Sequence, residues 1–144
     1  MPDPTSRALL ERLVAFPTVS RDSNLALIDF IRGYLDGLGV DSELFHNRER
    51  TKANLFATVG PSDRGGIVLS GHTDVVPVDG QAWSVEPFRL TEREGRLYGR
   101  GTADMKGFIA AALAIVPRLL QQPLNLPVHL AFSYDEEVGC LGVR

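Results

Sequence analysis

The chain has 144 residues, of which 44% are hydrophobic and 23% charged, and its formal net charge is −3. These values are typical of one globular domain or part of one, and without a Lys/Arg cluster they give no reason to expect nucleic-acid binding. No apolar run approaches the ~20 residues of a membrane span, and the single cysteine, Cys140, cannot form an internal disulfide. We therefore expect a soluble, cytoplasmic protein.

Two amphipathic helices are predicted first along the chain. Thr5 or Ser6 can cap the first helix, which ends before Pro17. Its apolar stripe consists of Leu9, Leu10, Leu13 and Val14. The second helix begins at residues 23–24 and is expected to stop at Gly39. Its buried face, with helical spacing, consists of Leu27, Ile28, Ile31, Tyr34, Leu35 and Leu38.

Three strands are predicted to follow. Residues 40–46 and 55–59 are rich in strand-forming side chains and are separated by a charged turn. Residues 67–70 (IVLS) form a continuous apolar run, which is typical of a buried strand.

The rest of the chain is predicted to contain a hairpin, a helix and a strand. The hairpin spans residues 87–98, with residues 88–91 paired to residues 96–98 and its tip at residues 94–95. The helix spans residues 105–121, and Pro117 should kink or shorten it. Residues 128–133 form the last strand. Because helices alternate with apolar strands, we expect an α/β fold, a three-layer sandwich with a mostly parallel mixed sheet.

Three short segments carry acids, a histidine and glycines beside these elements. They are residues 71–74 (GHTD), 99–104 (GRGTAD) and 135–137 (DEE). In an open α/β sheet, ligands collect beyond the carboxyl ends of the strands. One imidazole and several carboxylates are the usual donors of a zinc hydrolase centre. Together the segments predict a metal site.

His72 and Asp74 lie two residues apart beyond a predicted strand. Residues i and i+2 of an extended backbone project to the same side, so both can reach one site. A metal-bound imidazole commonly donates its other N–H to a carboxylate or carbonyl, and Asp74 could accept it. The alternative is a surface loop with a solvated histidine, which the pair taken alone would favour.

Asp104 lies among glycines that let a loop direct one carboxylate inward, namely Gly99, Gly101 and Gly107. Its two oxygens could bridge two cations. The alternative is a helix cap, because Asp104 precedes a predicted helix and a cap there is worth ~1 kcal/mol. Both roles can hold at once. Lys106 and Arg100 are expected to be solvated or paired with neighbouring acids.

Residues 135–137 place three acids in succession after an apolar strand. Partly buried acids this close repel and raise one another's pKa unless a cation offsets them. The functional interpretation is that one glutamate binds metal while the other stays free as general base. The alternative is a solvated acidic turn.

Longer blocks around these residues resemble the co-catalytic zinc family of aminoacylases and carboxypeptidase-G-like peptidases. The blocks are residues 70–77 (SGHTDVVP), 97–107 (LYGRGTADMKG) and 135–139 (DEEVG). Within that family, residues 83–88, 101–108 and 132–140 are most similar to acetylornithine deacetylases, with succinyl-diaminopimelate desuccinylases a close second.

The resemblance implies a role for each candidate residue. His72 would ligate one zinc ion, Asp104 would bridge both ions, and Glu137 would ligate the second. Glu136 would be the general base and acid, and Asp74 would orient His72. A cis peptide bond directly after Asp104 is also implied.

The resemblance further implies an activity. Two divalent ions, zinc or cobalt as a substitute, would support deacetylation of N-acetylornithine to ornithine and acetate, a step of arginine biosynthesis. The alternative substrates are N-succinyl-diaminopimelate, another N-acyl amino acid or a small peptide.

Family members are longer, carry two further metal ligands downstream and contain a dimerisation domain. We therefore expect residues 1–144 to be the amino-terminal part of a zinc-peptidase-like catalytic domain from a homodimeric protein. His46 and His129 are expected to be poor replacement ligands. Alone, the chain should bind zinc weakly, hydrolyse nothing, and expose apolar patches or self-associate. A non-catalytic truncated product is the alternative of another class.

Overall fold

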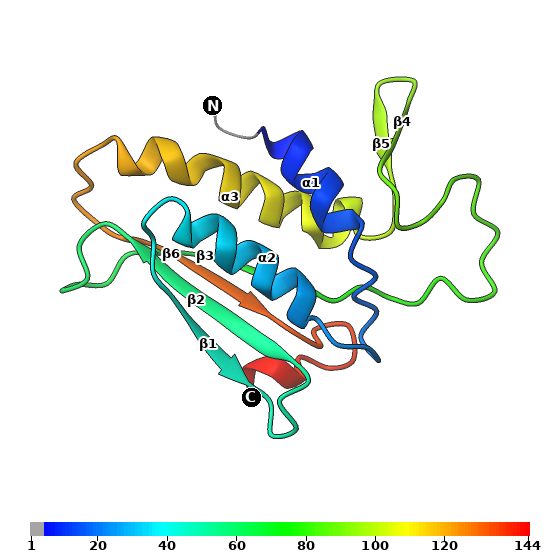
Figure 1. Ribbon diagram of the computed structural model, residues 1–144, viewed down its shortest axis with the longest axis horizontal. Helices are drawn as coiled ribbons and strands as arrows, with labels where there is room; N and C mark the ends of the chain where they lie inside the picture. Colours follow the sequence, from blue (N-terminus) through cyan, green and yellow to red (C-terminus); the bar gives the residue numbers. More distant parts are fainter. Residues whose placement is uncertain (1–4) are drawn as a thin grey trace.

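The described residues, 5–144, form three helices on one face of a four-stranded sheet in the computed structural model (Figure 1). The helices are α1 (Ser6–Val14), α2 (Leu25–Asp36) and α3 (Gly107–Leu120). The strands, in their order across the sheet, are β1 (Ser42–His46), β2 (Ala53–Val59), β6 (Val128–Ser133) and β3 (Ile67–His72). A separate hairpin and two short turns are β4 (Thr91–Arg93), β5 (Arg96–Tyr98), η1 (Thr102–Lys106) and η2 (Leu141–Val143).

The two amino-terminal helices form where the sequence predicts them. Thr5 caps α1, because its side-chain oxygen accepts the N–H of Ala8 at 3.2 Å, and the predicted apolar stripe is buried. Asn24 occupies the N-cap position of α2 but makes no capping bond. Helix α2 ends at Asp36, and Gly39, at φ +74°, adopts the left-handed conformation that glycine favours.

The sheet is mixed, and the α/β class is confirmed. Of its three pairings, β3 with β6 is parallel, whereas β1 with β2 and β2 with β6 are antiparallel. Parallel pairs are therefore fewer in this part of the fold than the sequence predicts. A short turn joins β1 to β2 and permits only an antiparallel pair, while the helical connection through α3 makes β3 and β6 parallel. Within residues 5–144, the layer of helices and the sheet form two of the three expected layers.

Strand β3 lies at the edge of the sheet, and the prediction that it is buried is wrong for its first half. Ile67 and Val68 are 59% and 53% exposed. An apolar run indicates burial only where neighbours cover it, and β3 has a paired strand on one side only. The strand also extends to His72, so the histidine is the last residue of β3, whereas the sequence places it after the strand.

Helix α3 continues three residues past Pro117, so the expected shortening does not occur. Proline lacks an N–H, which leaves the carbonyl of Leu113 without its helical donor. The hydroxyl of Tyr34, on α2, donates to that carbonyl at 3.2 Å. A contact between helices thus replaces the bond that proline removes.

The β4–β5 hairpin projects from the helical side of the molecule (Figure 1). Its tip is Glu94-Gly95 as predicted, and both residues have positive φ, 53° and 70°, as in a two-residue type I′ turn. The first strand begins at Thr91, later than expected from residue 88. Arg7 of α1 forms an exposed ion pair with Glu92 at 2.8 Å.

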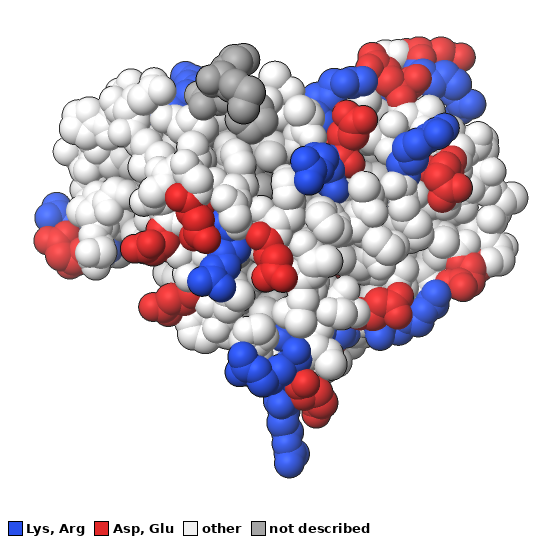
Figure 2. Space-filling view, viewed as in Figure 1, with Lys and Arg blue, Asp and Glu red and all other residues white. Residues whose placement is uncertain are grey.

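The hydrophobic core lies between the helices and the inner face of the sheet. Its largest fully buried apolar side chains are Leu13, Leu27, Ile28, Ile31, Leu35, Leu55, Ile109, Leu113, Leu130 and Phe132. The outer face is not covered by α1, α2 or α3, and it exposes apolar side chains, as expected, among them Phe45 at 54%. Acidic and basic side chains are interspersed on the surface shown in Figure 2. Among the helices of residues 5–144, none combines the length and hydropathy that a membrane span requires.

Candidate metal centre

The carboxyl ends of β3 and β6 lie side by side because the two strands are parallel. His72 is in register with Ser133, and the N–H of Thr73 continues the pairing by donating to the Ser133 carbonyl at 2.8 Å. Residues 135–137 follow β6 directly. Two of the three segments singled out in the sequence therefore meet at one edge of the sheet.

His72 lies among carboxylates from all three segments. Its Nε2 atom is 3.0 Å from Asp104 Oδ1 and 3.7 Å from Glu136 Oε2. One ligand atom each from His72, Glu136 and Glu137 lie within 4.8 Å of one another. His72 is buried, whereas the side chain of Asp104 is 75% exposed. One imidazole with several carboxylates is a donor set that fits zinc.

Asp74 connects the histidine to the acidic loop. Its carboxylate is buried and accepts the N–H groups of Glu136 and Glu137, at 3.0 and 3.3 Å, and the Ser20 hydroxyl at 2.5 Å. Nδ1 of His72 lies 3.0 Å from the carbonyl oxygen of Asp74 and 3.6 Å from its carboxylate. The carbonyl is thus the nearer partner of the imidazole. Either group fixes the orientation of a metal-binding histidine.

The charges at this edge of the sheet perturb one another. Hydrogen bonding to Asp74 raises the pKa of His72 to about 9, although burial opposes this shift. Burial tends to raise the pKa of Asp74, but bonds from His72, Ser20 and the two glutamate amides lower it to about 2. Burial and then the charge of Asp104 raise the pKa of Glu137. The crowded carboxylates favour a positive charge, which a divalent cation would supply in place of the imidazolium proton.

The loop before α3 directs Asp104 towards His72. Gly101 has φ +80°, and a Cβ there would lie 2.7 Å from Val75 Cγ1, so a larger residue does not fit. The peptide bond between Asp104 and Met105 is cis, as the resemblance implied. The alternative role as a helix cap is not seen, because Lys106 occupies the N-cap position of α3.

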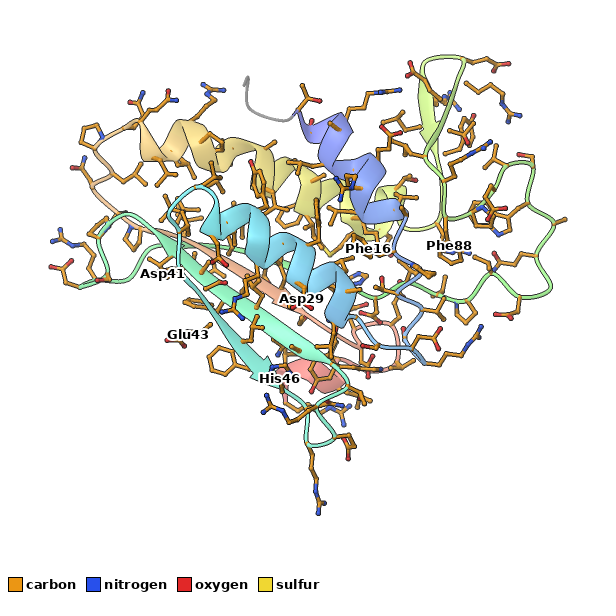
Figure 3. All side chains as sticks on the ribbon, in the orientation of Figure 1. Phe16, Asp29, Asp41, Glu43, His46 and Phe88 are labelled. Carbon is orange, nitrogen blue, oxygen red and sulfur yellow. The ribbon has the colours of Figure 1, made fainter. Side chains whose placement is uncertain are left out.

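Lys106 and Arg100 differ from the expectation that they are solvated or paired with acids. Lys106 is fully buried, and its Nζ donates to the Phe16 carbonyl at 2.7 Å, while burial lowers its pKa to about 7. Figure 3 shows Phe16 where the chain leaves α1. Arg100 lies over the ring of Trp83, 4.9 Å from its centroid, and donates to Gln81 at 2.6 Å.

Three polar residues behind the site could not be identified from the sequence. Ser20 holds the Asp74 carboxylate, and Lys52 contacts Asp135. Asn24 donates to the Ala53 carbonyl at 2.8 Å and to the Thr73 hydroxyl at 2.9 Å. Asn24 resembled a helix cap and Lys52 a solvated turn residue, so neither local pattern indicated a role at the site.

The other two histidines lie away from this group. His46 closes β1 at the edge of the sheet (Figure 3). His129 is packed within β6, where it stacks on Phe56 with ring centroids 5.4 Å apart and shares a 2.9 Å hydrogen bond with Thr58. Their expected exclusion from the ligand set agrees with these positions.

Comparison with known proteins identifies the family. Residues 68–144 match the model of Peptidase family M20/M25/M40. Because the match covers more than half of the chain, the protein belongs to this family. The resemblance drawn from the motif blocks is confirmed.

Proteins similar in sequence to this chain include acetylornithine deacetylases. The chain is 42% identical over 148 residues to acetylornithine deacetylase of Proteus mirabilis (strain HI4320) and 40% identical over 148 residues to that of Pasteurella multocida (strain Pm70). Each alignment covers 98% of this chain and 38% of the relative. The chain therefore spans well under half the length of these relatives.

Solved structures support the same assignment. Human carnosine dipeptidase 1 superposes with a TM-score of 0.82 at 26% identity, over 96% of this chain and 33% of that one. The M20 family metallo-carboxypeptidase Sso-CP2 from Sulfolobus solfataricus gives a TM-score of 0.84 at 25% identity, over 97% of this chain and 33% of that one.

Proposed function

We propose that residues 1–144 are the amino-terminal part of the catalytic domain of a metal-dependent amide hydrolase that converts N-acetylornithine to ornithine and acetate. The observation that carries the proposal is the group formed by His72, Glu136 and Glu137, whose ligand atoms lie within 4.8 Å of one another. The acetylornithine deacetylases among the relatives support the choice of substrate. The protein would act in the cytoplasm, in arginine biosynthesis, and as a homodimer in its full length.

Each site residue has a distinct part in this proposal. Two divalent ions, zinc or cobalt as a substitute, supply Lewis acidity to the amide carbonyl and to a water molecule when bound. His72 and Glu137 would each hold one ion, and Asp104 would be a ligand of both. Glu136 takes the proton from the water and returns it to the leaving amine. Asp74 fixes the imidazole of His72 and the backbone that carries both glutamates.

A deacetylation assay with added zinc or cobalt tests the activity. Three ligands for two ions hold metal weakly, so the 144-residue chain should show no turnover of N-acetylornithine. Turnover near the rate of full-length family enzymes would contradict that expectation.

The gene sequence beyond codon 144 separates the enzyme from a truncated product. An in-frame continuation with a further histidine and acid supports the enzyme, and an immediate stop supports the truncated product. The protein encoded by such a continuation should deacetylate N-acetylornithine faster than it cleaves N-succinyl-diaminopimelate, and the reverse preference would overturn the proposed substrate.

A further inference from the structure

Lys52 and Asp135 form an ion pair behind the acidic loop. The Nζ atom of Lys52, in the turn between β1 and β2, lies 2.6 and 2.8 Å from the two carboxylate oxygens of Asp135. Their side chains are only 13% and 11% exposed. Nζ also donates to the carbonyl oxygen of Ser20. Within the part of the chain that the structure describes, no other lysine or arginine forms an ion pair with residues 135–137.

The backbone of Asp135 has an uncommon conformation. Its φ is +56°, in the left-handed region that few residues other than glycine adopt. Such conformations persist where the surrounding structure imposes them. The side chain of Asp135 is held by Lys52, so this contact is placed to fix the turn from which the next two residues emerge.

A second anchor holds the same loop from the other side. Asp74 accepts the amides of Glu136 and Glu137. Ser20 joins the two anchors, because its carbonyl accepts from Lys52 while its hydroxyl donates to Asp74 at 2.5 Å. One connected set of polar contacts therefore holds the loop at Asp135 and at the backbone of both glutamates.

We propose that Lys52 is a positioning residue: by holding Asp135, it fixes the direction in which Glu136 and Glu137 project towards His72. Lys52 acts through Asp135 and contributes no atom to the group of ligand atoms. The inference rests on the proposed function, because it takes the two glutamates as a metal ligand and a general base.

The change in metal affinity when the charge of Lys52 is removed distinguishes a positioning role from a purely electrostatic one. Lys52 is a cation close to a proposed cation site, so Coulomb repulsion alone predicts that removing its charge strengthens metal binding. Positioning predicts the opposite. When the support of a metal-binding group is lost, metal affinity falls by roughly tenfold or more.

The affinity of the 144-residue chain for Co²⁺, measured by competition with a chromogenic chelator, makes this distinction. Lys52→Met should weaken binding by roughly tenfold or more, and Lys52→Arg, which keeps the charge and the donors, should restore it. Arg64→Met is the matched control, because it removes the same charge from an exposed ion pair with Asp63. Unchanged or tighter Co²⁺ binding by Lys52→Met would overturn the proposal.

Amide hydrogen exchange in the metal-free chain gives a second readout. Lys52→Met should speed exchange at Glu136 and Glu137 while leaving the core strand β6 protected. Equal exchange in variant and wild type would overturn the positioning role. If the wild-type chain binds no Co²⁺, the proposed metal centre fails, and exchange still decides the role of Lys52. Should Lys52→Met not fold, Lys52→Gln, which keeps a donor without the charge, is expected to change both readouts in the same direction.

Discussion

The carboxylate of Asp74 is almost fully buried, and a buried charge must be matched by donors because it loses its hydration. Ser20 and the amides of Glu136 and Glu137 supply three such donors. The same residue presents its carbonyl to His72. One side chain and its backbone thus hold both the imidazole and the acidic loop, which makes Asp74 the residue on which the arrangement of the site depends.

Asp74→Asn should destabilise the metal-free chain. The amide replaces one accepting oxygen with a donor that faces other donors, so we expect a loss of about 1.5–3 kcal/mol in the free energy of unfolding. Urea unfolding in the presence of EDTA measures it. Asp63→Asn, in an exposed pair with Arg64, should leave the free energy of unfolding nearly unchanged. Equal losses in the two variants would show that Asp74 is no special anchor.

The His72–Asp74 pair should make stability depend on pH. The pKa of His72 is raised from 6.5 to about 9, so its contribution is complete below 6.5 and lost as pH rises through 9. The pKa of Asp74 is lowered from 3.8 to about 2, so its contribution is present above 3.8 and lost as pH falls through 2. His72 and Asp74 together stabilise the folded chain most between these two pH ranges, at mildly acid pH.

The comparison with His72→Gln isolates this contribution. Buried Lys106, whose pKa is lowered from 10.5 to about 7, adds stability as pH rises between those values and opposes the trend of His72. Lys106 is common to wild type and variant, so its effect cancels. In EDTA, the stability difference between wild type and His72→Gln should be larger at about pH 5.5 than at about pH 9.5. A difference that grows with pH would contradict the assignment.

At the scale of elements, a hydrogen bond between α2 and α3 replaces the helical hydrogen bond that Pro117 removes. Tyr34 donates to the Leu113 carbonyl, which Pro117 leaves without a helical donor. This contact accounts for a helix that continues beyond Pro117.

A double-mutant cycle tests this compensation. Tyr34→Phe should cost about 1 kcal/mol of unfolding free energy in the wild-type chain. In the Pro117→Ala background the new N–H can satisfy Leu113, so the same substitution should cost less. Urea unfolding of the four proteins gives the coupling, and equal costs in both backgrounds would refute the explanation.

Some elements could be predicted from the sequence because their signals are local. The stripe and cap of α1 and the glycine at the hairpin tip each follow from neighbouring residues. The exposure of β3 could not be predicted, because it depends on which strands and helices lie beside it. The balance of parallel and antiparallel pairs likewise depends on the order of strands in the sheet.

The residues of the candidate site also fall into those that could be predicted from the sequence and those that could not. His72, Asp104 and the two glutamates could be found because each lies at or beside the end of an element with a recognisable pattern. Ser20 and Lys52 could not, since their partners lie 54 and 83 residues away. A contact between distant residues leaves no spacing in the sequence, so only the folded chain brings the supporting network into view.

At the scale of the whole molecule, α1, α2 and α3 cover one face of the sheet, and none of them covers the other, which is the open face (Figure 1). Phe45 and Val68 are more than half exposed, and β3 is an edge strand with unpaired backbone groups along one side. Exposed apolar surface beside an open strand edge is a common cause of association between chains.

The 144-residue chain should therefore self-associate. Sedimentation velocity should show an average mass that increases with concentration, and Phe45→Lys with Val68→Lys should return the chain to a monomer. Ile115→Lys is the control, since Ile115 is exposed on α3, away from the open face. A wild-type chain that stays monomeric at all concentrations would contradict this prediction.

Zinc titration calorimetry tests the central claim most directly, namely that His72 and its neighbouring carboxylates hold a divalent cation. The wild-type chain should bind Zn²⁺, and His72→Gln and Glu137→Gln should each weaken binding by roughly tenfold or more. Glu49→Gln, in the exposed turn after β1, should leave the affinity unchanged. No measurable binding by the wild type, or equal binding by all four proteins, would contradict the account.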